Sequence, residues 1–121
     1  MILRESAENY LETIYVLGLG SAAVRSVDIA AELSVSKPSV SVAMKNLREG
    51  GYIEMDADAF ITLTPSGHEI AERMYERHIV LTKWLAALGV PEATAALDAC
   101  RIEHIISAES FDAIKALAEG V

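Results

Sequence analysis

Apolar residues recur at helical spacing over most of this chain, and short polar or glycine-containing segments separate the recurrences. Residues 5–17 carry such a stripe and predict a first helix, which Gly18 and Gly20 are expected to end. Ser26 has the character of an N-cap residue and predicts a short second helix that reaches Leu33.

A third helix is predicted after a tight turn over residues 34–36, with Pro38 in its first turn. Val40, Met44 and Leu47 lie four and then three residues apart, so they share one face that we expect to pack into the core. Two consecutive glycines are expected to end this helix.

A β-hairpin is predicted next, because two β-prone runs, residues 52–55 and 60–63, flank an acidic turn. The order helix, helix, turn, helix, hairpin is typical of a winged helix-turn-helix. We therefore expect a mainly α protein in which residues 1–64 form a winged helix-turn-helix DNA-binding domain and residues 65–121 form a helical domain.

Three helices are predicted in the second part of the chain. Thr64 is expected to cap a long helix that begins at Pro65 and reaches about Leu88. Pro91 is expected to begin a fifth helix that carries the single cysteine, and a last helix is predicted over residues 107–118.

The composition is that of a small folded protein of 121 residues, 52% of them hydrophobic, with one cysteine. No apolar run approaches the roughly 20 residues that span a bilayer, and the N-terminal residues lack a signal-peptide pattern. One cysteine excludes an internal disulfide and suits a reducing compartment. We therefore expect a cytoplasmic protein with no membrane partner.

The formal net charge of −8 weighs against nucleic-acid binding, since phosphate contacts need local positive charge. Between residues 28 and 63 there are six acidic side chains and three basic ones, and the predicted wing tip is acidic. DNA binding by this chain would therefore depend on local placement, on dimerisation or on a bound cation.

The outward face of the third helix is the candidate DNA-reading element. Its small hydroxyls suit contacts to phosphates or base edges, its valine suits a thymine methyl group, and its lysines suit phosphates. A solvated polar face is the alternative, and the face in isolation does not decide between them. The candidate DNA-binding residues are Ser36, Lys37, Pro38, Ser39, Ser41, Val42 and Lys45.

Cys100, Glu103 and His104 carry the strongest chemical signal in the sequence. At positions i, i+3 and i+4 they share one face of a helix. A thiolate, a carboxylate and an imidazole together suit a first-row transition ion. The alternative is a small buried cysteine beside ordinary polar side chains.

Such an ion needs further ligands from elsewhere in the chain. Asn9 and Glu12 are three residues apart on the first helix and share a face, and His78 lies on the long helix. Mixed O, N and S donors fit Fe(II), Mn(II), Co(II) or Ni(II) better than a structural zinc site. His68 has no evident partner and is expected to be a surface residue.

The sequence contains no Gly-rich phosphate loop, no convincing nucleophile–base pair and no zinc-protease motif. We therefore expect neither an enzyme nor a small-molecule substrate. Two rival functions stay open. One is a metal-independent winged-helix module that binds protein, which the acidic wing tip favours. The other is a thiol redox sensor in which Cys100 reacts beside His104.

Six short segments, spread over nearly the whole chain, match the sequence pattern of one known protein family. They are Glu8–Tyr15, Asp28–Ala30, Pro38–Ser41, Leu63–Gly67, Arg77-His78 and Ala99–His104. The Cys-Arg-x-Glu-His and Thr-Pro-x-Gly motifs are specific in combination. Through them the chain resembles the diphtheria toxin repressor family of metal-dependent transcriptional repressors, which includes the manganese transport regulators.

This resemblance implies a winged-helix DNA-binding domain followed by a helical dimerisation and metal-binding domain. Members bind operator DNA as dimers when Fe(II) or Mn(II) is loaded, and they repress metal-uptake genes. The implied partners are therefore double-stranded operator DNA and a second copy, in metal homeostasis. The implied ligands are Asn9, Cys100, Glu103 and His104 in one site, with Glu12 and His78 in a neighbouring site.

Several features depart from the family pattern. Asn9 stands where iron-type members have Met and manganese-type members have Asp, whereas Cys100 is the iron-type residue where manganese-type members have Glu. Thr82 and Ala96 replace further ligands of iron-type members. The sequence ends before their SH3-like third domain, which implies the manganese-type architecture. On the strength of Cys100 we expect Fe(II), with Mn(II) as the close second.

The dimer surface is expected to be apolar and helical. Trp84, Leu85 and Leu88, near the end of the long helix, are the candidate interface residues. Core packing is the equal alternative for these three side chains.

Overall fold

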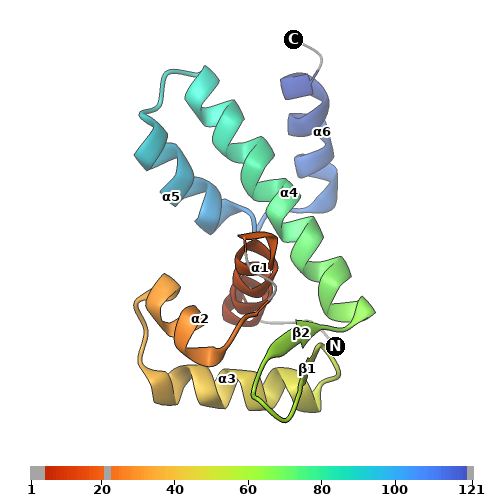
Figure 1. Ribbon diagram of the computed structural model, residues 1–121. Coiled ribbons are helices and arrows are strands. Elements are labelled where there is room, and N and C mark those ends of the chain that lie inside the picture. Colours follow the sequence, from red (N-terminus) through yellow and green to blue (C-terminus); the bar gives the residue numbers. More distant parts are fainter. Residues whose placement is uncertain (1–4, 21–22, 120–121) are drawn as a thin grey trace. The chain divides into compact units, whose positions relative to one another are not determined.

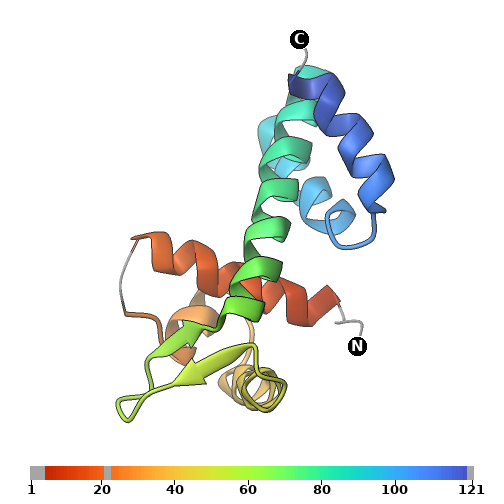
Figure 2. The ribbon, with the colours of Figure 1, turned by 90° about the vertical axis from the view of Figure 1, so that its right-hand side faces the viewer.

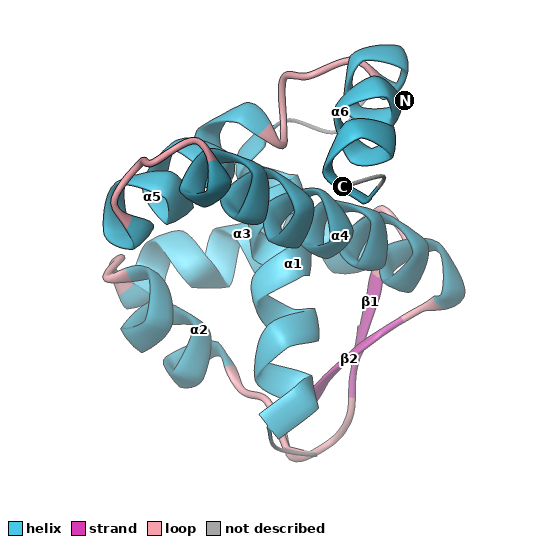
Figure 3. Ribbon diagram, turned by 90° about the horizontal axis from the view of Figure 1, so that it is seen from above, coloured by secondary structure: helices cyan, strands magenta, loops and turns pink. Residues whose placement is uncertain are grey.

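The computed structural model describes residues 5–20 and 23–119 and divides the chain into two units, Met1–Glu72 and Arg73–Val121. Within the described residues there are six helices and one two-stranded sheet (Figure 3). The prediction of a mainly α protein is confirmed.

The first unit begins with α1 (Glu5–Gly20), whose Leu11 and Ile14 are buried. The prediction that α1 ends before Gly18 was wrong. Glycine costs a helix about 1 kcal/mol relative to alanine, but it keeps its backbone hydrogen-bonding groups. The helix therefore continues through Gly18, where an added Cβ would meet nothing within 4 Å.

The helix-turn-helix consists of α2 (Ser26–Leu33) and α3 (Lys37–Glu49). The predicted cap of α2 was wrong by one residue. Arg25 occupies the N-cap position, and its backbone N–H donates to the Asp28 carboxylate at 2.9 Å. The predicted turn between the helices is confirmed, with Ser34 in the left-handed conformation at φ 54°.

The α3 helix presents the predicted apolar face to the core, since Val40, Met44 and Leu47 are all buried. Ser36 caps this helix by accepting a hydrogen bond from the Ser39 N–H at 3.3 Å. The predicted start near Pro38 and the predicted glycine end are confirmed.

The wing is an antiparallel hairpin of β1 (Ile53–Met55) and β2 (Ile61–Leu63), which lies beside α3 (Figure 2). The hairpin prediction is confirmed, although both strands are shorter than the predicted runs. The Asp56 carboxylate accepts hydrogen bonds from two backbone N–H groups in the wing turn, each at 2.9 Å.

One apolar core joins the elements of the first unit. It combines α1, α2, α3, both strands and the first turns of α4. Its buried residues are Leu11, Ile14, Val24, Ile29, Ala30, Val40, Met44, Leu47, Ile53, Ile61 and Ala71.

The long helix α4 (Pro65–Ala87) begins at a tight junction with the wing. As predicted, Thr64 caps it, because the Thr64 hydroxyl accepts from the Gly67 N–H at 3.2 Å. A Cβ added at Gly67 would lie 2.0 Å from the Tyr52 carbonyl oxygen. Only glycine therefore fits this first helical turn without displacing the backbone.

In the second unit, α5 (Glu92–Ile102) and α6 (Ala108–Glu119) lie on two sides of the second half of α4 (Figure 1). Leu81, Ala99 and Phe111 form its small buried core. Both helices agree with prediction to within about one residue at their starts. Among the helices formed by residues 5–20 and 23–119, none has the length and apolar character needed to cross a membrane.

Candidate metal centre

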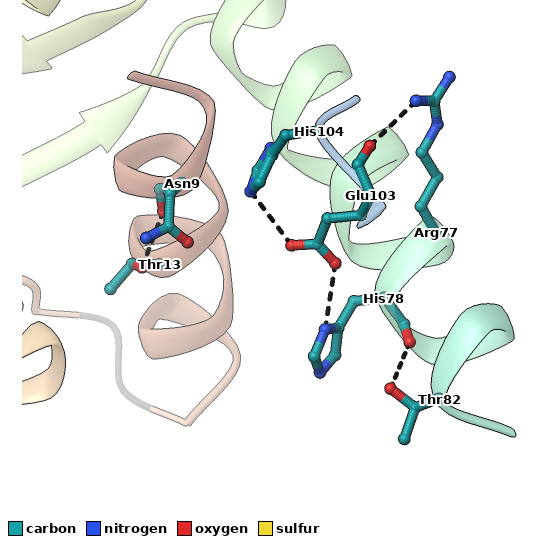
Figure 4. Close-up of polar contacts among 7 residues, drawn as sticks. All are labelled: Asn9, Thr13, Arg77, His78, Thr82, Glu103 and His104. Atoms are coloured by element: carbon teal, nitrogen blue, oxygen red, sulfur yellow. Dashed lines mark hydrogen bonds and ion pairs between the residues drawn. The ribbon is translucent and has the colours of Figure 1, made fainter. Parts of the chain in front are cut away.

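Glu103 is the centre of a buried polar cluster in the second unit. Its carboxylate is 0% exposed and lies between two imidazoles (Figure 4). Glu103 Oε2 is 3.0 Å from His78 Nδ1, and Glu103 Oε1 is 3.3 Å from His104 Nε2. A buried carboxylate is costly unless it is paired, so these imidazoles provide polar contacts that burial requires.

Cys100 belongs to the same cluster. One ligand atom from each of Cys100, Glu103 and His104 can be chosen so that all lie within 4.8 Å of one another. The predicted convergence of these three side chains is thus present in the second unit.

The helical assignment behind that prediction was partly wrong, because α5 ends at Ile102. Glu103 is the C-cap residue and His104 lies in the following turn. The shared face survives because Glu103 keeps a helical backbone, with φ −58° and ψ −28°, and donates its N–H to the Ala99 carbonyl.

The donor set fits a divalent transition ion. A cysteine sulfur, a carboxylate oxygen and an imidazole nitrogen lie close together at the buried Glu103, and a second imidazole, that of His78, approaches Glu103 from α4. Such a mixed set of soft and hard donors suits Fe(II), Mn(II) or Co(II). The chemistry of the residues therefore agrees with a metal site.

Asn9 and Glu12 lie on α1, in the first unit. Glu12 is 7% exposed, and the Asn9 carbonyl accepts a hydrogen bond from the Thr13 hydroxyl at 2.8 Å. One helical turn separates these two positions, as the sequence predicted. Their part in metal binding stays a prediction.

Sequence reasoning missed Arg77 as a component of this cluster. Its Nη1 donates to the carbonyl oxygens of Glu103 and Ile106, each at 3.0 Å. Its position directly before His78 was the available signal. On the adjacent turn of α4, another side chain binds a backbone carbonyl: the Thr82 hydroxyl donates to the His78 carbonyl at 2.7 Å (Figure 4).

His68 is exposed, as expected, but the prediction that it has no partner was wrong. His68 Nδ1 lies 3.4 Å from Glu72 Oε2, and its ring meets the Tyr15 ring edge-on at 5.4 Å between centroids. The Tyr15 contact joins α1 to α4 within the first unit and is invisible to local sequence patterns.

The candidate DNA-reading face of α3 is solvent-exposed at every predicted position, from Ser36 through Lys45. Ser36 also has a structural task, because its hydroxyl donates to the Ser39 hydroxyl at 2.8 Å in addition to capping the helix. The exposed face is available to a ligand, and its role in DNA binding stays a prediction.

The three candidate interface residues differ in their surroundings. Trp84 packs against the small core of the second unit, Leu85 is half-buried and Leu88 is 65% exposed. Trp84 and Leu88 both line a largely apolar groove of about 990 Å³ between α4 and α6. A role for these residues in dimerisation stays a prediction.

Comparison with known sequences supports this arrangement. The profile described as "Iron dependent repressor, N-terminal DNA binding domain" matches residues 2–59. The profile described as "Iron dependent repressor, metal binding and dimerisation domain" matches residues 64–120. "Transcriptional regulator MntR" of Salmonella typhimurium is 37% identical over 116 residues, which is 96% of this chain and 74% of that protein.

Solved structures agree with the sequence matches. "Structure of the manganese regulator SloR" aligns with a TM-score of 0.84 at 26% identity, over 98% of this chain and 55% of that one. "Manganese-dependent transcriptional repressor complex with manganese" aligns with a TM-score of 0.86 at 27% identity, over 93% of this chain and 52% of that one. This chain therefore spans about half the length of either structure.

The winged helix-turn-helix, the cysteine–glutamate–histidine cluster and these matches lead to one conclusion. The chain belongs to the iron-dependent repressor family of metal-dependent transcriptional repressors.

Proposed function

We propose that this protein represses transcription by binding double-stranded operator DNA as a homodimer when Fe(II) or Mn(II) is bound. The observation that carries the proposal is the convergence of Cys100, Glu103 and His104 in a protein whose other unit is a winged helix. Its role is metal homeostasis in the cytoplasm, with no catalytic step, small-molecule substrate or membrane partner.

The metal ligands are proposed to come from both units. Cys100, Glu103, His104 and His78 supply sulfur, oxygen and nitrogen donors from the second unit. Asn9 and Glu12 would add oxygen donors from α1, a proposal that rests on their helical spacing and on the sequence resemblance.

The domain boundary is proposed at residue 64. Residues 1–64 would form the DNA-binding domain and residues 65–121 the dimerisation and metal-binding domain, which Trp84, Leu85 and Leu88 would help to pair. The exposed position of Leu88 beside an apolar groove supports this use of α4.

Coupling between metal and DNA follows from this division. A divalent cation held by these residues would supply positive charge that offsets the carboxylates. Asn9 and Glu12, as ligands of that cation, would then hold the winged helix in one position relative to the dimer, so that the spacing of the two α3 helices would match the operator half-sites. Thermodynamic reciprocity requires that operator DNA tighten metal binding.

The contact surface on DNA is proposed to be the exposed face of α3. Lys37 and Lys45 would contact phosphates, while Ser39, Ser41 and Val42 would meet base edges or phosphates. The Ser36 hydroxyl would donate to a phosphate or a base edge, and Pro38, just inside the helix start, would press its apolar ring against a base. Because this surface has few cations, shape and hydroxyl contacts would provide much of the specificity.

Fe(II) and Mn(II) are both retained as the activating ion. The Cys100 thiolate favours the softer Fe(II), whereas the two solved structures are manganese regulators by title. Anaerobic titration of each ion against the full chain will rank them directly.

The test of this function starts with duplexes selected from a random library by the full chain in the presence of Mn(II). Their affinity is then measured anaerobically without metal, with Mn(II) and with Fe(II). We expect at least a tenfold gain with metal, equivalent to about 1.4 kcal/mol of coupling. Metal-independent binding would favour an ordinary interaction module, and binding that depends only on oxidation would favour a thiol sensor.

A further inference from the structure

Arg77 on α4 makes two hydrogen bonds from one nitrogen atom. Its Nη1 donates to the carbonyl oxygens of Glu103 and Ile106, both at 3.0 Å. Its guanidinium also lies over the ring of Phe111, with Cζ 5.5 Å from the ring centroid. A single side chain therefore connects α4, the 103–106 turn and α6 within the second unit.

The position of these two carbonyls explains why a positively charged guanidinium is a suitable hydrogen-bond donor to them. The α5 helix ends at Ile102, and carbonyl groups just beyond a helix end lack intrahelical partners. A guanidinium near such an end also interacts favourably with the helix dipole. Arg77 therefore fixes the path of the backbone immediately after α5.

That backbone carries two side chains of the polar cluster. Glu103 is held through its own carbonyl, while its carboxylate faces His78 on one side and His104 on the other. His78 is the residue next to Arg77 on α4. The Arg77 bond thus sets the separation between the backbone of Glu103 and the helix that carries its imidazole partner.

We propose that Arg77 is a positioning residue for the metal site, an inference that rests on the function proposed above. By anchoring the 103–106 turn in the metal-free protein, Arg77 holds Glu103 and His104 in the arrangement in which they serve as ligands. Without this anchor the turn samples more conformations in the metal-free protein. The conformational entropy lost when the turn becomes ordered then lowers the metal affinity.

A general structural role is the rival explanation, since Arg77 also packs on Phe111. Phe111→Leu is the matched control, because it disturbs the same packing but leaves both carbonyl hydrogen bonds available. Arg77→Met removes the donors and keeps an unbranched apolar stem. Arg77→Lys keeps a charged donor nitrogen on a side chain that is one atom shorter.

The experiment uses the full chain of each variant and anaerobic titration with Co(II), followed by its visible absorption. We expect Arg77→Met to weaken Co(II) affinity by about 10–100-fold, as loss of a group that orients a ligand does. Arg77→Lys should fall between Arg77→Met and the wild type. Phe111→Leu should leave the affinity nearly unchanged even where its thermal midpoint falls as far as that of Arg77→Met.

Hydrogen exchange of the metal-free protein gives an independent readout. Arg77→Met should raise exchange mainly at the amides of residues 103–106, whereas Phe111→Leu should raise it mainly in α6. The inference is overturned if Arg77→Met binds Co(II) as tightly as the wild type, or if the two variants lose affinity in proportion to their lost stability. Failure of the wild type itself to bind Co(II), Fe(II) and Mn(II) would instead overturn the proposed function, and this inference with it.

Discussion

His78 Nδ1 lies 3.0 Å from Glu103 Oε2, although 25 residues separate the two positions in the chain. The contact forms because α5 ends against the second half of α4 and leaves Glu103 as a fully buried C-cap residue. Local spacing predicts that Cys100, Glu103 and His104 share a face, whereas the meeting with His78 depends on how two helices pack.

The first prediction concerns the charge of Glu103. Glu103→Gln keeps the shape of the side chain but removes the negative charge that a divalent cation needs. We expect Mn(II) and Co(II) affinity to fall by at least the roughly 10–100-fold that loss of an outer-shell partner costs. Isothermal titration of the full chain measures this effect.

The control for Glu103→Gln is Glu109→Gln, which removes an equal charge from an exposed position in the first turn of α6. We expect this control to bind both ions like the wild type. Equal losses in the two variants would show that the effect comes from net charge and would contradict a ligand role for Glu103.

The second prediction concerns metal preference. Cys100→Ser replaces a soft sulfur donor by a hard oxygen donor, so it should weaken Co(II) and Fe(II) more than Mn(II). The near-ultraviolet thiolate-to-Co(II) absorption of the wild type should disappear. Cys100→Glu, which introduces a carboxylate, should shift the preference further towards Mn(II). An unchanged Co(II) spectrum in Cys100→Ser would exclude the thiolate as a ligand.

Most of the fold was predictable because each element has a local signal. The helical spacing of Val40, Met44 and Leu47 predicts α3, and the Thr64-Pro65 pair predicts where α4 begins. The errors were also local: Gly18 does not end α1, and Arg25 takes the cap position predicted for Ser26. Single residues at helix ends contribute about 1 kcal/mol, which tertiary packing readily overrides.

The candidate site was less predictable, because part of it depends on contacts between distant segments. Arg77 stands beside His78 in the sequence, but its bond to the Glu103 backbone carbonyl, across 26 positions, has no local spacing that would predict it. The His68–Tyr15 ring contact is a similar case in the first unit. Side chains that bind backbone atoms far along the chain have no characteristic spacing, so sequence reasoning does not find them.

The third prediction concerns the junction of the wing with α4. A Cβ at Gly67 would lie 2.0 Å from the Tyr52 carbonyl oxygen, so Gly67→Ala must displace backbone. We expect a loss of roughly 3 kcal/mol or more, at or beyond the upper end for overpacked sites. Gly18→Ala is the matched control, because it lies in α1 with open space around it and should gain up to about 1 kcal/mol. Urea unfolding measures both, and a Gly67→Ala protein of wild-type stability would contradict the close approach.

The fourth prediction concerns the exposed face of α3 and its contact with phosphates. Lys45→Ala should weaken binding to all DNA sequences by a similar factor and reduce the slope of log K against log salt by about 1. Val42→Ala should instead weaken binding only to duplexes with a thymine methyl group that Val42 touches, without changing the slope.

The control is Lys83→Ala, which removes an exposed lysine from the part of α4 in the second unit and should change neither the affinity nor the slope. Fluorescence anisotropy in the presence of Mn(II), repeated over a range of salt concentrations, separates these outcomes. Equal slopes for the wild type and Lys45→Ala would remove Lys45 from the phosphate contacts and would favour a different surface for DNA.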